Sequence, residues 1–199
     1  PLADKSEKKL IHFINGRPLK GPFGKELKKI VLGMGCFWGS EKKFWNLNGV
    51  FVTAVGYSGG RTRYPTYQEV CAGNTYHNEV VLIYYDAETL SLEEILKAFW
   101  EGHDPTQGMR QGNDIGSQYR SGIYLYSNND LSKAKKSKET YQKNLTGSGF
   151  KEITTEILMA SEFFYAEEYH QQYLAKNPTG YCGLGGTGVT FDTRVCIES

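Results

Sequence analysis

The chain is organised around the stretch Lys29-Ile30-Val31-Leu32-Gly33-Met34-Gly35-Cys36-Phe37-Trp38-Gly39. Its apolar first half predicts a short buried strand over residues 29–34, and the polar residues after Gly39 predict an amphipathic helix over residues 38–47. Cys36 then lies in the first turn of that helix, where free backbone N–H groups and the helix dipole favour a thiolate. We therefore predict a nucleophile at Cys36, with the pair Phe37-Trp38 as a pocket wall.

Composition indicates one globular domain whose charge balance does not favour binding to polyanions. A chain of 199 residues can bury a sizeable core, and its aromatic content of 14% predicts an aromatic-lined site. Basic and acidic residues number 23 and 22, which excludes electrostatic binding of nucleic acid or an anionic membrane. No apolar run approaches the roughly 20 residues of a membrane span. We expect a cytoplasmic monomer; the alternative is a protein from which an organelle-targeting segment has been removed.

The cysteines indicate redox chemistry. Four cysteines (Cys36, Cys71, Cys182 and Cys196) are too few for a dense disulfide framework in a domain of this size. They favour a reducing compartment with catalytic or redox thiols. The four histidines show no zinc-binding spacing with the cysteines, so we expect neither a metal nor a cofactor.

Hydrophobic periodicity predicts alternating strands and helices in one α/β-type domain, without a linker or repeat. The expected strands are residues 29–34, 50–57, 78–85, 119–126 and 152–160, and the expected helices are 38–47, 67–71, 91–100, 130–144 and 166–176. The helix after Ser91 opens with the capping box Ser91-Leu92-Glu93-Glu94. This pattern leaves strand order and direction undetermined.

The glycine-rich end is open to three interpretations. Gly183-Leu184-Gly185-Gly186-Thr187-Gly188 matches G-x-G-x-x-G, but a helix precedes it and the required acidic residue is missing, so we reject dinucleotide binding. Composition alone favours a disordered terminus. The cysteine at position 182 favours instead a mobile arm that carries a thiol to another site.

Other candidates are ambiguous when taken singly. Glu79 opens an apolar strand; burial beside the aromatic pair would raise its pKa and make it a general acid, whereas the alternative is a solvated strand-end carboxylate. The long polar loop from Gly108 to Arg120 is typical of a binding loop or of a surface excursion. Three histidines (His77, His103 and His170) could each act as a base for Cys36, with structural roles as the default.

Six segments together resemble one enzyme family. They are Gly35-Cys36-Phe37-Trp38-Gly39, Gly56-Tyr57-Ser58-Gly59-Gly60, Pro65-Thr66-Tyr67-Gln68-Glu69-Val70-Cys71, His103-Asp104-Pro105-Thr106-Gln107, the run from Gln111 to Ser121, and Asn177-Pro178-Thr179-Gly180-Tyr181-Cys182-Gly183. In this order, and from about residue 29 to 189, they are similar to the A-class peptide methionine sulfoxide reductases.

The resemblance implies an α+β, two-layer, plait-like fold with a mixed sheet, surrounding helices and long coil segments. Residues 1–199 would form a single catalytic domain, with an N-terminal extension over 1–28. Residues 177–199 would form a mobile C-terminal tail carrying the recycling cysteines.

The resemblance also implies the chemistry. Cys36 corresponds to the nucleophile that reduces methionine-S-sulfoxide, free or in proteins, and becomes a sulfenic acid. Cys182 corresponds to the resolving cysteine, and thioredoxin to the external reductant. The remaining implied residues hold the substrate: Glu79 as proton donor, Tyr67 and Tyr119 on the sulfoxide oxygen, Phe37 and Trp38 around the methyl group, and Asp114 lining the site.

Two cysteines fit the family pattern less well. Cys196 lies farther beyond the glycine run than the second tail cysteine of many relatives; we lean towards a shuttle that passes the disulfide outward, with a bystander as the alternative. For Cys71 a buried structural thiol is the better interpretation.

Two other classes remain as alternatives. A non-catalytic module would bind oxidised methionine or a thioether in the aromatic pocket and keep binding in Cys36→Ser. A Cys–His hydrolase would form a stable acyl adduct on Cys36 instead of a sulfenic acid.

Overall fold

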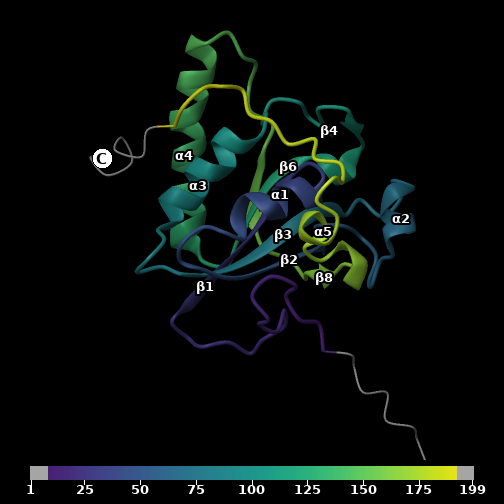
Figure 1. The fold of residues 1–199 in the computed structure, drawn as a ribbon. Coiled ribbons are helices and arrows are strands. Elements are labelled where there is room, and N and C mark those ends of the chain that lie inside the picture. Colours follow the sequence, from purple (N-terminus) through teal and green to yellow (C-terminus); the bar gives the residue numbers. More distant parts are fainter. Residues whose placement is uncertain (1–8, 192–199) are drawn as a thin grey trace, which may run out of the picture.

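The computed structural model describes residues 9–191 and has a six-stranded mixed sheet with helices packed around it (Figure 1). The strands are β1 (Leu27–Met34), β2 (Val50–Ser58), β3 (Asn78–Asp86), β6 (Ser121–Leu125), β7 (Glu156–Met159) and β8 (Phe164–Tyr165), in the order β7-β6-β1-β3-β2-β8. The predicted α+β class is confirmed.

The strand that opens the Cys36 segment is central in this sheet. β1 pairs antiparallel with β3 on one side, Ile30 opposite Ile83, and with β6 on the other, Leu32 opposite Ile123. β6 and β7 are parallel, and a parallel connection needs a long crossover. The crossover is the longest helix, α4 (Asn128–Gly147).

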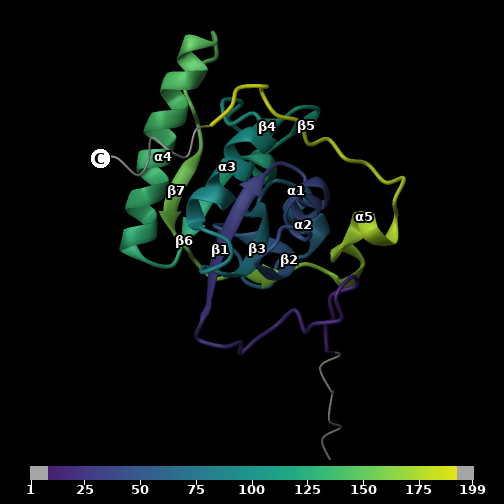
Figure 2. The same cartoon turned by 60° about the vertical axis from the view of Figure 1, so that its left-hand side comes forward.

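The two faces of the sheet are covered differently. Helices α1 (Phe37–Phe44), α3 (Leu92–Gly102) and α4 contribute apolar side chains to the main core on one face (Figure 2). On the other face, Val52 and Ala54 of β2 pack with Leu19 from the N-terminal segment. Among residues 9–191, no helix combines the length and apolar character that crossing a bilayer requires.

Most expected elements form, and the capping box of α3 is present, with Ser91 and Glu94 each accepting from the other's backbone N–H. A short helix α2 (Tyr67–Cys71) follows the capping residue Thr66. The predicted strand at 119–126 begins later, because residues Ser117–Tyr119 form the 3-10 turn η1. The loop before η1 contains a small ladder of β4 (Arg110–Gln111) and β5 (Asp114–Ile115).

The predicted helix over residues 166–176 is wrong. The chain there forms a 3-10 turn η2 (Glu168–His170) and a single helical turn α5 (Tyr173–Lys176), with the edge strand β8 before them. Gln172 interrupts the helix because its backbone is left-handed, with φ of 49°. The buried amide of Gln171 binds the backbone of Val55 through both its oxygen and its nitrogen, which fixes this segment on β2.

A glycine makes the turn from β1 into α1. Gly35 has φ of 94°, and a Cβ there would lie 2.7 Å from the side chain of Gln111. Only glycine combines that backbone with so close an approach. The tight turn places Cys36 directly at the start of α1.

A buried carboxyl group fastens α1 to the segment before α5. Glu41 is fully buried, and its two oxygens accept hydrogen bonds from the Thr53 hydroxyl and from the backbone and side-chain N–H groups of Gln172, each at 2.8 Å. Burial raises the pKa of Glu41 above its usual range, and these donors oppose the rise. The network holds the left-handed Gln172 next to His170 and Tyr173.

We expect Glu41→Ala to lower the free energy of unfolding by about 3 kcal/mol, because it leaves several buried donors without an acceptor. Urea denaturation measures the change. Glu41→Gln is the matched control, and it should cost less because it keeps an acceptor oxygen. Equal stability of wild type and Glu41→Ala would show that the network contributes nothing.

Candidate active site

Cys36 is the half-buried N-cap residue of α1. Its sulfur accepts hydrogen bonds from the backbone N–H groups of Trp38 and Gly39, as expected at a helix start. Burial nevertheless raises the pKa of Cys36, and the negative charge of Glu79 raises it further. The prediction of a favoured thiolate is therefore wrong for the unliganded protein, because desolvation outweighs the helix N-terminus.

Glu79 is buried at the start of β3, opposite Tyr57 of β2. Burial raises the pKa of Glu79 to about 8, the charge of Asp114 adds to the rise, and a hydrogen bond from the backbone N–H of Phe37 opposes it. Its atom Oε2 has no hydrogen-bond partner among the described residues. Glu79 is thus a protonated carboxyl group at neutral pH, and the alternative of a solvated carboxylate is excluded.

Two phenols lie in the electrostatic environment of this carboxyl group. Tyr67 is the first residue of α2 and Tyr119 the last residue of η1. Burial raises the pKa of each, and the charge of Glu79 raises both further. Both hydroxyls therefore stay protonated and are able to donate hydrogen bonds. The structure brings together Cys36, Glu79 and both predicted tyrosines.

The aromatic pair after Cys36 is packed against other rings. Phe37 is fully buried, with its ring centroid 5.8 Å from that of Tyr57. Trp38 stacks on Tyr173 at 3.8 Å with an interplanar angle of 12°, and its Nε1–H donates to Nδ1 of His170 at 3.0 Å. Sequence reasoning gave no role to Tyr57, although it lies in the quoted segment of residues 56–60, and missed Tyr173, which lies outside the quoted segments.

The three histidines proposed as bases have structural partners. His77 accepts from the backbone N–H of Gly60, and His103 lies between the Phe99 carbonyl and the Ser121 hydroxyl. Burial lowers the pKa of His170 to about 4, so this ring is neutral, and its Nδ1 is occupied by Trp38. The default structural interpretation is therefore confirmed for all three, and His170 supports the pocket wall.

The C-terminal segment runs past this cluster. The Tyr181 hydroxyl donates to Oδ2 of Asp114 at 3.1 Å, which ties the residue before Cys182 to the start of β5. Cys182 itself is an exposed free thiol. A Cβ placed on Gly39 would lie 3.0 Å from the sulfur of Cys182, so this sulfur lies against the first turn of α1.

Farther on, the same segment is fixed to the helices. The Tyr141 hydroxyl of α4 donates to the carbonyl of Val189, and the backbone N–H of Phe191 donates to Glu101 of α3. Phe191 is buried in the core. These contacts hold Val189 and Phe191 in place, so any movement of the predicted mobile tail is limited to the residues before Val189. The mobility of that part of the tail stays a prediction.

Of the other two cysteines, Cys71 lies next to this cluster, within electrostatic reach of Glu79. Cys71, expected to be buried, is exposed at the end of α2, where Tyr67 hydrogen-bonds to its sulfur; the short helix leaves its last residue in solvent. Burial of its sulfur still raises the pKa of Cys71. Cys196 lies outside the described residues.

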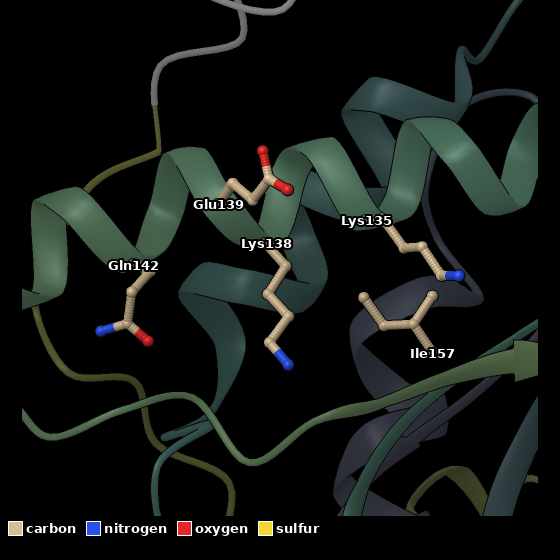
Figure 3. A pocket seen from close by; sticks show the side chains of 5 residues that line it. All are labelled: Lys135, Lys138, Glu139, Gln142 and Ile157. Atoms are coloured by element: carbon tan, nitrogen blue, oxygen red, sulfur yellow. The ribbon is translucent and has the colours of Figure 1, made fainter.

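A separate cavity of about 450 Å³ lies between α4 and β7 (Figure 3). Its lining residues are Lys135, Lys138, Glu139, Gln142 and Ile157. None of these was predicted to belong to the site, and they include no thiol and no aromatic ring. Within residues 9–191, no cluster of His, Cys, Asp and Glu side chains is able to hold a metal ion.

The sequence is similar to known proteins over most of its length. The family model described as peptide methionine sulfoxide reductase matches residues 28–190. A relative from Rippkaea orientalis, peptide methionine sulfoxide reductase MsrA, is 63% identical over 179 residues, which are 90% of this chain and 82% of the relative.

Two solved structures are similar as well. Methionine sulfoxide reductase A of Corynebacterium diphtheriae has a TM-score of 0.79 at 43% identity, covering 87% of this chain and 84% of that one. Mxr1 from Saccharomyces cerevisiae, in complex with Trx2, has a TM-score of 0.56 at 26% identity, covering 77% and 89%. The match over most of the sequence and the shared fold lead to one conclusion: this chain belongs to the peptide methionine sulfoxide reductase family.

Proposed function

We propose that the protein reduces methionine-S-sulfoxide, free or within proteins, through a sulfenic acid on Cys36. The observation that carries the residue assignment is the buried, protonated Glu79 with an unpartnered oxygen, in the electrostatic environment of the half-buried Cys36. A sulfoxide sulfur is a poor electrophile until its oxygen is hydrogen-bonded or protonated. Glu79 supplies this proton to the sulfoxide oxygen, next to the nucleophile Cys36.

The first step follows from the positions of these groups. Phe37 and Trp38 hold the apolar end of the substrate, while Tyr67 and Tyr119 hydrogen-bond to the sulfoxide oxygen. Glu79 donates its proton to that oxygen as the sulfur of Cys36 attacks, and the thiol proton of Cys36 replaces the one that Glu79 lost. The S–O bond of the substrate breaks as a new S–O bond to the sulfur of Cys36 forms, and methionine leaves. Cys36 is then a sulfenic acid, whose hydroxyl carries the substrate oxygen and the proton that Glu79 gave.

Cys182 resolves this intermediate. Its thiol condenses with the sulfenic acid, which forms the Cys36–Cys182 disulfide and releases water. The support is the place of the Cys182 sulfur against the turn of α1 that also binds Cys36. Asp114 assists by accepting the hydrogen bond of the neighbouring Tyr181. Cys196 then shuttles the disulfide outward or takes no part.

Thioredoxin is the proposed reductant that returns the thiols. The complex of Mxr1 with Trx2 supports this choice, because a relative of this chain binds a thioredoxin. Exchange with a dithiol removes the disulfide without a metal or cofactor. A chain that works through free thiols fits a reducing compartment, and we place it in the cytoplasm.

The two rival classes have less support. A pure binding module needs neither a thiol at a helix start nor a second thiol beside it. A Cys–His hydrolase needs a free imidazole as a base for Cys36, whereas His170 is bound to Trp38 and the other two histidines are bound elsewhere.

A reaction without added reductant tests the function. We expect the reduced protein to form methionine from the S epimer of a blocked methionine sulfoxide and not from the R epimer, with thiols lost in pairs. Chromatography measures methionine, and thiol titration measures the loss. An unchanged methionine yield in Cys36→Ser would overturn the proposal, while binding without methionine formation by the wild type would favour the binding module.

The pKa of Glu79 predicts a pH dependence of the first step. Glu79 is protonated below about 8 and loses its proton as the pH rises through that value, so the single-turnover rate should fall there. The raised pKa of Cys36 means that no thiolate forms over the same range to offset the fall.

In Glu79→Gln we expect the rate of the first step at pH 7 to be about 100-fold lower, which is the usual contribution of a general acid. The decrease of the wild-type rate near pH 8 should be absent in this variant. Stopped-flow measurement of methionine formation reads both quantities. Glu88→Gln, on an exposed turn, is the matched control and should leave the profile unchanged. A wild-type rate in Glu79→Gln would remove Glu79 from the mechanism.

A further inference from the structure

Gly39 lies next to both sulfurs of the proposed relay. Its backbone N–H donates to the sulfur of Cys36. A Cβ at this position would lie 3.0 Å from the sulfur of Cys182 and 3.2 Å from Cβ of Leu184. One residue of α1 thus contacts the nucleophile through its backbone and leaves room for the resolving thiol through its missing side chain.

The backbone of Gly39 does not itself require glycine. Gly39 is an ordinary residue of the helix α1, without the left-handed φ that makes glycine necessary at Gly35. Alanine is favoured over glycine at such a helical position. The close approach of the C-terminal segment is the feature that a side chain here would disturb.

We propose that Gly39 is a positioning residue for the disulfide-forming step; the inference rests on the proposed function. In that step the S–O bond of the Cys36 sulfenic acid breaks and an S–S bond to Cys182 forms. The hydroxyl group leaves as water with the thiol proton of Cys182. Because Gly39 presents only a hydrogen atom, the sulfur of Cys182 reaches the turn that holds Cys36.

Disulfide geometry makes the step sensitive to this spacing. The two Cβ atoms of a disulfide lie about 3.8 Å apart, so small displacements of one cysteine matter. The segment is also held on both sides of the contact, by Tyr181 on Asp114 and by Val189 on Tyr141. A methyl group on Gly39 therefore pushes Cys182 away while those ties limit how the segment rearranges.

Gly39→Ala tests the inference in single-turnover reactions without reductant. We expect one methionine per protein at close to the wild-type rate, because the N–H bond to Cys36 remains. Pairwise thiol loss should be about tenfold slower, and a 1,3-dione probe should trap the accumulated Cys36 sulfenic acid. The melting temperature should be equal or higher, since alanine favours the helix.

Gly185→Ala is the matched control, because a Cβ at Gly185 meets nothing within 4 Å. It should resolve the sulfenic acid at the wild-type rate. Thiol loss at the wild-type rate in Gly39→Ala would overturn the inference, as would equal slowing in both variants or loss of the first methionine in Gly39→Ala. Failure of the proposed function is distinguishable, because it appears in Cys36→Ser as an unchanged methionine yield.

Discussion

The burial of Glu79 beside Cys36 is the constraint around which the site is built. Desolvation makes the charged forms of both groups unfavourable, so the unliganded protein holds a neutral carboxyl group and a neutral thiol together. A strong general acid and a nucleophile usually demand opposite surroundings. In the proposed first step one buried environment serves both groups, because Glu79 gives up its proton as the thiol of Cys36 attacks.

The rest of the fold maintains this environment. Gly35 turns the chain sharply from β1 into α1, and the register of β2 and β3 places Glu79 opposite Tyr57. The position of Trp38 depends on a segment more than 120 residues later in the sequence, because His170 and Tyr173 hold its ring. Glu41 binds Gln172, which lies between these two residues in the sequence, so a fully buried carboxyl group helps to hold the segment that contacts Trp38.

The sequence predicted the elements whose signal is local. Strands β1, β2 and β3 are continuous apolar runs, and the capping box marks α3. The prediction of a helix over 166–176 was wrong, although the pattern of apolar and polar residues there resembles a helix. Long-range hydrogen bonds of Gln172 to Glu41 and of Gln171 to Val55 hold the segment in another conformation, with a left-handed backbone at Gln172. The state of Cys36 was also wrong, since a helix start is visible in sequence and the depth of burial is not. Family motifs suggested the remaining site residues, whose roles stay predictions, and the motifs gave no reason for glycine at position 39.

The most direct measurement of the central claim is the pKa of Glu79 in the free, reduced protein. Carbon NMR of side-chain-labelled glutamate, with Glu79→Gln to assign the signal, gives its titration curve. A buried general acid requires a midpoint of about 8. A midpoint near 4.5, the ordinary value of the side chain, would mean that Glu79 is charged at neutral pH and would contradict the account.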